Sequence, residues 1–375
     1  MVNKRDFPHH MLQEIHEQPR TVRDTLAGRL DPSSGLVSLG ALSWTEAELK
    51  SLTWIRIVAS GTSRYAGLVA KYMIEELARI PVEVDYASEI ECRRLSASVP
   101  PLTIVISQSG ETADTLAALR RAKREDSKTL AICNVENSSM MREADFALQV
   151  QAGPELSVPS TKAFGGQLTC LFLLALCLAQ VRQSRSHHEL RDYALEATRI
   201  PQKLETALQL ERRCAQIAKR YFRVPDFIFF GRGPHYPIAL DGALKLKEVA
   251  YIHAEGYPGG EFKHGQITLV DDEIVAVLIA TCDAKDPDSV ERSRRMLADA
   301  SEIRALSGHV IALATEDDEN ILSAAEEVLY LPAAPELLLP LLEIVPLELI
   351  AYHIAVCKGL NPDKPRNLTK AVTIT

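Results

Sequence analysis

The sequence lacks the patterns that mark several common kinds of site. It contains seven cysteines, but no two stand at C-x-x-C spacing, which argues against a zinc site and against a disulfide framework. It has no G-x-x-x-x-G-K-S segment and no G-x-G-x-x-G in a dinucleotide-binding setting, so neither a nucleoside triphosphate nor NAD is the expected ligand. The cysteines are therefore expected to be reduced thiols, most of them in the core.

The sequence also lacks an excess of positive charge and an uninterrupted apolar run long enough to cross a membrane. The formal net charge is -8, which gives no overall attraction to nucleic acid or anionic lipid, and basic clusters such as Arg120–Arg124 are typical of solvated helix faces. The longest strongly apolar run, Leu168–Val181, is too short to cross a bilayer and indicates a core helix. The first residues carry no apolar secretion signal, so we expect a cytoplasmic protein.

What the chain does contain is an alternation of strand and helix patterns. Its 375 residues, 46% of them hydrophobic, suffice for two packed domains. Strands are expected at 55–60, 82–87, 102–107, 129–135 and 146–150, with helices following the earlier ones. This order is typical of βαβ units and of a mostly parallel sheet. The expected fold class is therefore α/β.

The same pattern begins again at Asp226. A strand, a glycine turn and a helix are expected within 226–255, followed by strands at 273–280, 309–315 and 327–332 and a charged helix at 286–306. Two α/β halves of similar layout, joined by a helical stretch from Thr161 to about Arg220, are the simplest interpretation.

A loop rich in hydroxyl and amide side chains follows the third expected strand. These side chains belong to Ser107, Gln108, Ser109, Thr112 and Thr115. In open α/β sheets, ligands bind beyond the carboxyl ends of the strands, where helix N-termini present unpaired N–H groups. Small polar residues around Gly110 would let a phosphomonoester approach the backbone.

The alternative is that Ser109 or Thr112 simply caps the next helix, because Ser and Thr are preferred capping residues. A single hydroxyl would favour that explanation. Two more polar stretches, Ser60–Ser63 at the end of the first strand and Ser157–Thr161 before the linker helix, make capping alone the weaker explanation.

The second half supplies groups that anion binding does not need. Asp241, Lys245 and Glu248 stand at helical spacings of four and three, although from spacing alone a solvated face with ordinary ion pairs is the more common case. Next come Glu261, Lys263 and His264 between glycines, and Lys370 near the end. Most lone histidines and lysines in proteins are structural or solvated. The sequence pattern alone therefore makes His264 and Lys370 candidates and does not assign them a role.

At this point a family resemblance is plain. It runs nearly end to end through "MLQEIHEQP", "SGTS", "SQSGETADT", "AICNV", "STKAF", "YPIALDGALKLKE", "YIHAE", "GEFKHG", "VPLELIAYH" and "KPRNLTKAVT". The chain resembles the isomerase part of the glucosamine 6-phosphate synthases, which are also called glutamine:fructose-6-phosphate aminotransferases. That isomerase part is built from two sugar isomerase (SIS) domains. The resemblance implies two tandem SIS domains, each a mostly parallel sheet flanked by helices in a flavodoxin-like three-layer arrangement.

The expected domain bounds are an N-terminal helical segment at 1–45, a first SIS domain with its linker helix at 46–200, a second SIS domain at 201–356 and a tail closing the active site at 357–375. The resemblance also implies which residues bind the sugar phosphate: Thr62, Ser63, Ser107, Gln108, Ser109 and Thr112, with Val158 and Ser160 lining the pocket.

The roles of the catalytic residues likewise follow from the resemblance. It implies that Glu248 moves a proton between C1 and C2, that Lys245 helps to shuttle protons and that Lys370 forms a Schiff base with the ketose carbonyl. His264 of a neighbouring subunit would assist ring opening, so at least a homodimer is expected. This chemistry is coherent, because a lysine iminium at C2 acidifies the C1 proton, and it requires neither a metal ion nor an organic cofactor.

Departures from the family pattern shape the expected function. Glutaminase domains of these synthases use an N-terminal cysteine, and this chain has none before Cys92. We therefore expect interconversion of fructose 6-phosphate plus ammonia with glucosamine 6-phosphate, as a deaminase or an ammonia-dependent synthase, with glucose 6-phosphate isomerisation as a possible side activity. A separate glutaminase chain supplying ammonia is a further possibility.

Asp241 stands where the synthases commonly carry Glu, which leaves its role in the proton relay open. Pro159 and Thr369 adjoin expected substrate contacts and leave the preferred sugar open. An isomerase or deglycase for another amino sugar phosphate is therefore an alternative. A sugar-phosphate-binding regulatory SIS module is another, although such a module needs no Glu248, His264 and Lys370 together.

Overall fold

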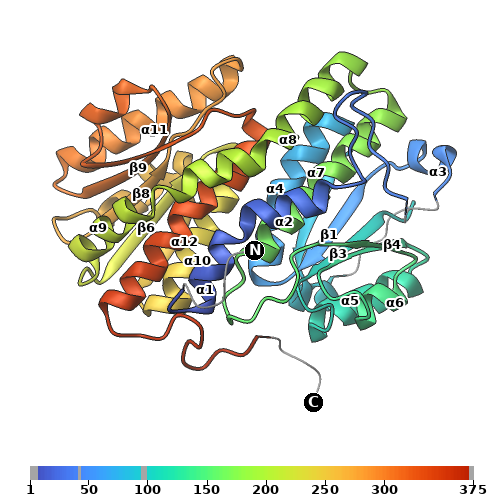
Figure 1. Ribbon diagram of the computed structural model, residues 1–375, viewed down its shortest axis with the longest axis horizontal. Coiled ribbons are helices and arrows are strands. Elements are labelled where there is room, and N and C mark those ends of the chain that lie inside the picture. Colours follow the sequence, from blue (N-terminus) through green and yellow to red (C-terminus); the bar gives the residue numbers. More distant parts are fainter. Residues whose placement is uncertain (1–6, 41–43, 94–98, 371–375) are drawn as a thin grey trace. The chain divides into compact units, whose positions relative to one another are not determined.

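The computed structural model describes residues 7–40, 44–93 and 99–370. Its contacts divide the chain into two compact units. The first-repeat unit comprises 20–155, 162–199 and 369–375, and the second-repeat unit comprises 1–19, 156–161 and 200–368. Each unit contains one five-stranded sheet with helices on both faces (Figure 1).

The first sheet is parallel throughout, in the order β2-β1-β3-β4-β5. Its strands are β1 (Ile55–Ala59), β2 (Val82–Tyr86), β3 (Leu102–Ser107), β4 (Lys128–Cys133) and β5 (Phe146–Gln149). The helices in the same part of the chain are α2 (Gln18–Leu26), α3 (Glu46–Lys50), α4 (Gly61–Ala78), η1 (Ala87–Cys92), α5 (Ala113–Arg124), α6 (Ser139–Glu143), α7 (Lys162–Arg182) and α8 (His187–Leu208). All five strands were predicted from the sequence.

Because successive side chains of a strand point to opposite faces, the two faces of this sheet contact different helices. Val58 and Val105 are paired in register and pack against α5 and its neighbours, whereas Ile57 contacts Gly67 of α4 on the opposite face. A Cβ atom at Gly67 would lie 2.8 Å from the Ile57 side chain, so α4 needs glycine to approach the sheet this closely.

The second sheet repeats the same parallel topology in the order β10-β9-β8-β6-β7. Its strands are β6 (Asp226–Gly231), β7 (His253–Pro258), β8 (Val275–Ile279), β9 (His309–Thr315) and β10 (Glu327–Leu331). The helices are α1 (His10–His16), α9 (Glu211–Tyr221), η2 (Gly233–His235), α10 (Tyr236–Ala250), η3 (Gly259–His264), η4 (Gln266–Leu269), α11 (Pro287–Ala305), η5 (Glu319–Ser323), η6 (Glu336–Leu338) and α12 (Leu339–Cys357). These two sheets confirm the predicted α/β fold.

Within the part of the chain that the structure describes, two helices are long and apolar enough to cross a membrane, by length and composition alone. They are Lys162–Arg182 and Glu336–Cys357, and 89% and 94% of their most apolar windows are buried inside the structure. Burial of this extent is typical of core helices. It confirms the prediction that the run Leu168–Val181 belongs to the core of a domain.

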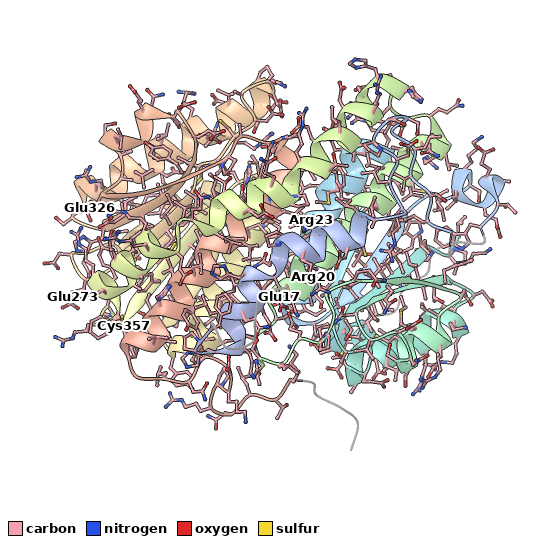
Figure 2. All side chains as sticks on the ribbon, in the orientation of Figure 1. Glu17, Arg20, Arg23, Glu273, Glu326 and Cys357 are labelled. Atoms are coloured by element: carbon pink, nitrogen blue, oxygen red, sulfur yellow. The ribbon has the colours of Figure 1, made fainter. Side chains whose placement is uncertain are left out.

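All seven cysteines lie among the described residues, and all are free thiols. Four are buried, Cys282 is partly buried, and Cys92 and Cys357 are exposed. Figure 2 labels Cys357 together with Glu273 and Glu326, whose side chains are exposed on the second-repeat unit. The prediction of reduced thiols, mostly in the core, is confirmed.

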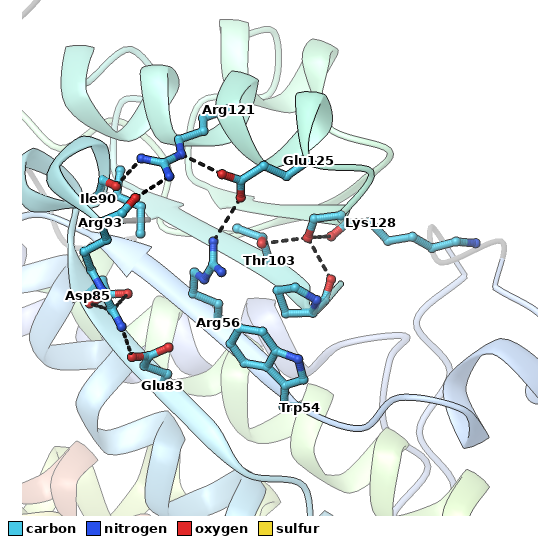
Figure 3. A network of polar contacts seen from close by, with 12 residues as sticks. Trp54, Arg56, Glu83, Asp85, Ile90, Arg93, Thr103, Arg121, Glu125 and Lys128 are labelled. Carbon is cyan, nitrogen blue, oxygen red and sulfur yellow. Dashed lines mark hydrogen bonds and ion pairs between the residues drawn. The ribbon is translucent and has the colours of Figure 1, made fainter. Parts of the chain in front are cut away.

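An ion-pair network fixes α5 to the edge of the first sheet (Figure 3). Arg93 pairs with Glu83 and Asp85 of β2, and the Arg121 guanidinium donates to the Ile90 and Arg93 carbonyl oxygens. Arg121 is only 19% exposed, so the prediction of a solvated face is wrong at this position. The side chain instead holds α5 against the chain that follows β2. The helix α5 begins directly after the segment Ser107–Thr112, which we call the hydroxyl loop.

Candidate phosphosugar site

The polar loops of the first-repeat unit meet at one place on its sheet. The chain runs outward from β1 to β2 and then returns to place β3 on the other side of β1, which makes the β1/β3 border the topological switch point. The turn Ser60–Ser63 follows β1, and the segment Ser107–Thr112 begins at the end of β3. In sheets of this order, ligands bind beyond the carboxyl ends of the strands at that border.

The hydroxyl loop is held by its own hydrogen bonds. The Ser107 hydroxyl, 3% exposed, lies 2.9 Å from the Thr112 hydroxyl and accepts from the Gly110 N–H at 3.0 Å. The Ser109 hydroxyl accepts from the Glu111 N–H at 3.2 Å. Gln108, Ser109 and Thr112 are partly exposed. The loop therefore presents polar groups from a fixed backbone.

Thr112 is the N-cap residue of α5, but its side chain makes no capping hydrogen bond. Its hydroxyl faces Ser107 across the loop instead. Ordinary capping, the alternative that the sequence left open, therefore does not account for this hydroxyl. The N-terminus of α5 keeps backbone N–H groups available for an anion.

Gly110 fixes the shape of the loop. Its φ is +68°, and a Cβ atom there would lie 2.0 Å from Ser138 Oγ and 2.4 Å from Ser138 Cβ. Its carbonyl oxygen accepts from the Met140 N–H at 3.1 Å, and the neighbouring Glu111 carboxylate accepts from the Ser139 N–H at 2.7 Å. Only glycine satisfies both the conformation and the close approach to the segment before α6.

The first turn of α4 lies beside the start of α7. Thr62 is 8% exposed, and the Ser63 hydroxyl accepts from Gln167 Nε2 at 3.0 Å. Gln167 lies on α7, which packs along α4. One of the two predicted substrate contacts of this turn, Ser63, is thus supported by a buried amide that the sequence gave no reason to single out.

Lys370 also belongs to the first-repeat unit. Its ammonium lies 2.8 Å from Glu155 Oε2, and the Glu155 side chain is fully buried. The other carboxylate oxygen of Glu155 accepts from the Ala163 N–H at 3.0 Å. The structure therefore places the predicted imine-forming lysine beside a buried carboxylate that sequence reasoning missed.

In the second-repeat unit, α10 brings together the predicted base and proton shuttle. Lys245 is fully buried, and its ammonium lies 2.8 Å from Glu248 Oε2, whose side chain is 20% exposed. Asp241, one turn before Lys245, is buried as well. Burial by itself lowers the pKa of Lys245, but Glu248 and Asp241 outweigh it and raise the pKa above its ordinary value. This is not a solvated helix face.

The remaining predicted residues also lie in this unit. His264 is the last residue of η3 and is exposed. Val158 and Ser160 lie in the segment 156–161, where the Val158 N–H donates to the Asp363 carbonyl oxygen at 2.9 Å. Among the described residues, no three or more His, Cys, Asp and Glu side chains form a group that could hold a metal ion.

Comparison with known proteins places both repeats in one family. The SIS domain model matches residues 50–177 and 223–358, which together cover more than half of the chain. The chain belongs to the SIS domain family. Each matched part contains one of the two five-stranded sheets, which have the same strand order, and we now call these parts the first and second SIS domains.

Relatives extend the likeness over the whole chain. The glutamine–fructose-6-phosphate aminotransferase (isomerizing) of Chlorobaculum tepidum is 44% identical over 373 residues, covering 100% of this chain and 59% of the relative. The C-terminal domain of a glucosamine-fructose-6-phosphate aminotransferase from Francisella tularensis has a TM-score of 0.89 at 38% identity, covering 97% of this chain and 100% of that one. A glucosamine-6-phosphate deaminase from Thermotoga maritima, 21% identical with a TM-score of 0.70 and coverage of 97% and 100%, shares the fold. The chain thus spans about 60% of the length of the curated relatives.

The second SIS domain has no hydroxyl loop at its own switch point, the border of β6 and β8. His235, after β6, and Thr281, after β8, both bond to Glu343 Oε1 of α12, with 2.7 Å from the histidine Nδ1. Glu343 is fully buried, and Glu336 pairs with His235 and Arg292. The first SIS domain differs at its corresponding border, where Ser107 and Thr112 place two hydroxyl groups 2.9 Å apart.

We expect His235 to make a pH-dependent contribution to the free energy of unfolding. Burial lowers its pKa, but Glu343 and Glu336 outweigh burial and raise the pKa to about 9 from 6.5. The stabilisation is then complete below pH 6.5 and is lost as the pH rises through about 9. We expect the difference in unfolding free energy between the unmodified chain and His235→Gln to shrink by roughly 3 kcal/mol across that window. Denaturant titrations at pH 6 and 10 measure it; an equal difference at both values would contradict the assignment.

Proposed function

We propose that this chain interconverts glucosamine 6-phosphate with fructose 6-phosphate and ammonia by moving a proton between C1 and C2. The observation that carries the proposal is the hydroxyl loop at the β1/β3 switch point of the first SIS domain, with Ser107 and Thr112 facing each other and Gly110 set by Ser138. Two relatives support the choice of sugar: both are named as aminotransferases acting on fructose 6-phosphate.

Binding comes first in the proposed reaction. The side chains of Ser107, Gln108, Ser109 and Thr112, the turn residues Thr62 and Ser63, and Val158 and Ser160 hold the sugar phosphate. The backbone N–H groups at the start of α5 add a partial positive charge next to the phosphate, so the anion is held by local groups although the chain's net charge is -8.

Proton transfer then requires one carboxylate that reaches two neighbouring carbons. Glu248 is suited to this role because it is partly exposed while its partner Lys245 is buried and charged. Lys245 returns protons to the base, and Lys370 forms an imine with the ketose carbonyl, which acidifies the C1 proton. This chemistry needs neither a metal ion nor an organic cofactor.

His264 is proposed to assist ring opening from a neighbouring subunit, in a cytoplasmic homodimer. Its exposure in this chain is compatible with such a role. Ammonia enters or leaves as the free molecule in the reaction proposed for these 375 residues.

A substrate panel tests the proposal. The purified chain is incubated with glucosamine 6-phosphate, and with fructose 6-phosphate in the presence and absence of ammonia, while ammonia and both sugars are measured. We expect equimolar ammonia and fructose 6-phosphate from the amino sugar, and specific activity that falls on dilution as a dimer dissociates. Neither product from glucosamine 6-phosphate would contradict the reaction, and full activity of a dilute monomer would contradict the role of His264.

A further inference from the structure

The carboxylate of Glu155 stands out among the acidic groups of the first SIS domain and its tail. It is fully buried, in the stretch between β5 and α7, and each of its oxygens has a different partner: Oε1 accepts from the Ala163 N–H at 3.0 Å, and Oε2 lies 2.8 Å from the Lys370 ammonium. Burying a carboxylate is costly unless it is paired and hydrogen-bonded. The tail lysine, 27% exposed, is therefore held by a deeply anchored group and not by a surface ion pair.

A short path connects this pair with the switch-point loops inside the same unit. Ala163, which holds Glu155, and Gln167, which donates to Ser63 at 3.0 Å, are four residues apart on α7 and so lie on one face of that helix. Ser63 belongs to the first turn of α4 after β1. The first two turns of α7 therefore support both the turn that follows β1 and the carboxylate that holds the tail amine.

We propose that Glu155 is the positioning residue of the reactive lysine: it holds the Lys370 ammonium in the same unit as the hydroxyl loop and accepts its proton when the amine attacks. This inference rests on the proposed function, since it assigns a partner to the imine-forming lysine. An ammonium has no lone pair with which to attack a carbonyl carbon, so a proton must leave Nζ before the N–C bond forms.

The proposed step is balanced without any further reactant. Glu155 takes one proton from the ammonium, and the freed amine forms a bond to C2 of the open-chain ketose. A second proton passes from the nitrogen to the former carbonyl oxygen, and Glu155 returns its proton to the same oxygen, which departs as water when the C2–O bond breaks. The product is an iminium that carries one N–H, and Glu155 is again a carboxylate.

The test measures imine formation directly. The chain is mixed with fructose 6-phosphate and sodium cyanoborohydride, which reduces the iminium to a stable adduct, and the adduct on Lys370 is quantified by peptide mass. In Glu155→Gln the amide oxygen can still accept from the Ala163 N–H, but the charge is lost. We expect trapping at least about tenfold slower, in line with the loss of a positioned proton acceptor. The affinity for glucitol 6-phosphate, which has no carbonyl, should stay within about twofold of the unmodified value, because the residues proposed to hold the phosphate are unchanged.

Two further variants separate this role from a merely structural one. Glu155→Asp keeps the carboxylate one methylene shorter and should recover part of the trapping rate. Glu327→Gln removes the charge of another buried carboxylate, which pairs with Arg213 and Arg220 in the second-repeat unit, and should trap at the unmodified rate. If Glu155→Gln does not fold, Glu155→Asp carries the test: slower trapping supports the proposal and an unchanged rate overturns it.

The outcomes also distinguish this inference from the proposed function. If the unmodified chain neither turns over sugar nor forms an adduct, the proposed function is wrong. If it forms the adduct and Glu155→Gln forms it equally fast, the proposed function stands and the role of Glu155 is overturned.

Discussion

Glu248→Gln is expected to lose turnover and keep its affinity for sugar phosphates. A glutamine amide cannot accept a proton from a sugar carbon, and a positioned general base contributes roughly 10²- to 10⁴-fold to rate. We therefore expect kcat for glucosamine 6-phosphate to fall by about 10³-fold. The hydroxyl loop, which is proposed to bind the phosphate, belongs to the other unit and is unchanged, so titration with glucitol 6-phosphate should give the unmodified affinity.

Control measurements make this result specific to the carboxylate. The amide oxygen of the variant can still accept a hydrogen bond from buried Lys245, but the negative charge beside that ammonium is gone, so the unfolding temperature is measured in parallel. Lys247→Gln alters an exposed charge on the same helix and should leave kcat unchanged. Turnover by Glu248→Gln at the unmodified rate would show that another group is the base. A sugar-phosphate sensor would bind in both forms and turn over in neither.

Gly110→Ala is expected to disrupt the hydroxyl loop, which is proposed to bind the phosphate. The methyl group would overlap Ser138, whose Oγ lies 2.0 Å from the ideal Cβ position, and the φ of +68° is itself unfavourable for alanine. The conformation alone costs roughly 1–2 kcal/mol, and forced repacking adds typically 1–3 kcal/mol. Because backbone N–H groups of this loop are proposed to hold the phosphate, we expect affinity for glucitol 6-phosphate to fall by more than about tenfold, the loss of one charge-assisted hydrogen bond.

A matched control separates the overlap from the backbone strain. Gly28 has nearly the same conformation, with a φ of +71°, but no atom lies within 4 Å of its Cβ position. Gly28→Ala should therefore lose only the conformational part of the stability and none of the affinity. Adding Ser138→Gly to Gly110→Ala should recover part of the unfolding free energy. Unchanged sugar-phosphate affinity in Gly110→Ala would argue that the ligand binds elsewhere.

The parts of the fold that repeat regular patterns could be predicted from the sequence. All five strands of the first sheet were predicted, from apolar runs such as Leu102–Ser107 and from the alternating pattern of Val82–Tyr86, and the restart at Asp226 correctly indicated a second α/β half. The strand β7 (His253–Pro258) was missed. Its residues, "HAEGYP", are mostly polar and include glycine and proline, which an edge strand tolerates because only one side needs partners.

Long-range assembly could not be predicted. The residues 1–19 and 156–161 group with the second SIS domain, since Glu14 of α1 accepts from the Ser157 N–H, and no spacing in the sequence indicates such a contact. The domain bounds drawn from the sequence alone stay predictions. The tail was expected either to dock or to be disordered. The described part docks: the Asp363 carboxylate accepts from the His10 and Met11 N–H groups, and the Arg366 N–H donates to the Tyr251 hydroxyl.

The candidate site could likewise be predicted from the sequence only in part. The hydroxyl loop was recognisable because polar side chains gather at one strand end, and the structure brings Ser107 and Thr112 together. Thr115, predicted as part of this group, instead lies inside α5 and is fully buried. Lys245 and Glu248 were found by helical spacing, but their burial was not, because an ordinary surface ion pair has the same spacing. Glu155 and Gln167 carried no signal in the sequence; each matters through a partner far along the chain.

The most direct measurement follows the hydrogen itself. Glucosamine 6-phosphate carrying deuterium at C2 is incubated with the chain, and the label is followed by NMR. If Glu248 moves this hydrogen within a sugar held at the hydroxyl loop, the deuterium leaves C2 and appears at C1 of fructose 6-phosphate or in water, and Glu248→Gln leaves it in place. Retention of the label at C2 by the unmodified chain, with the sugar phosphate bound, would contradict the proposed chemistry.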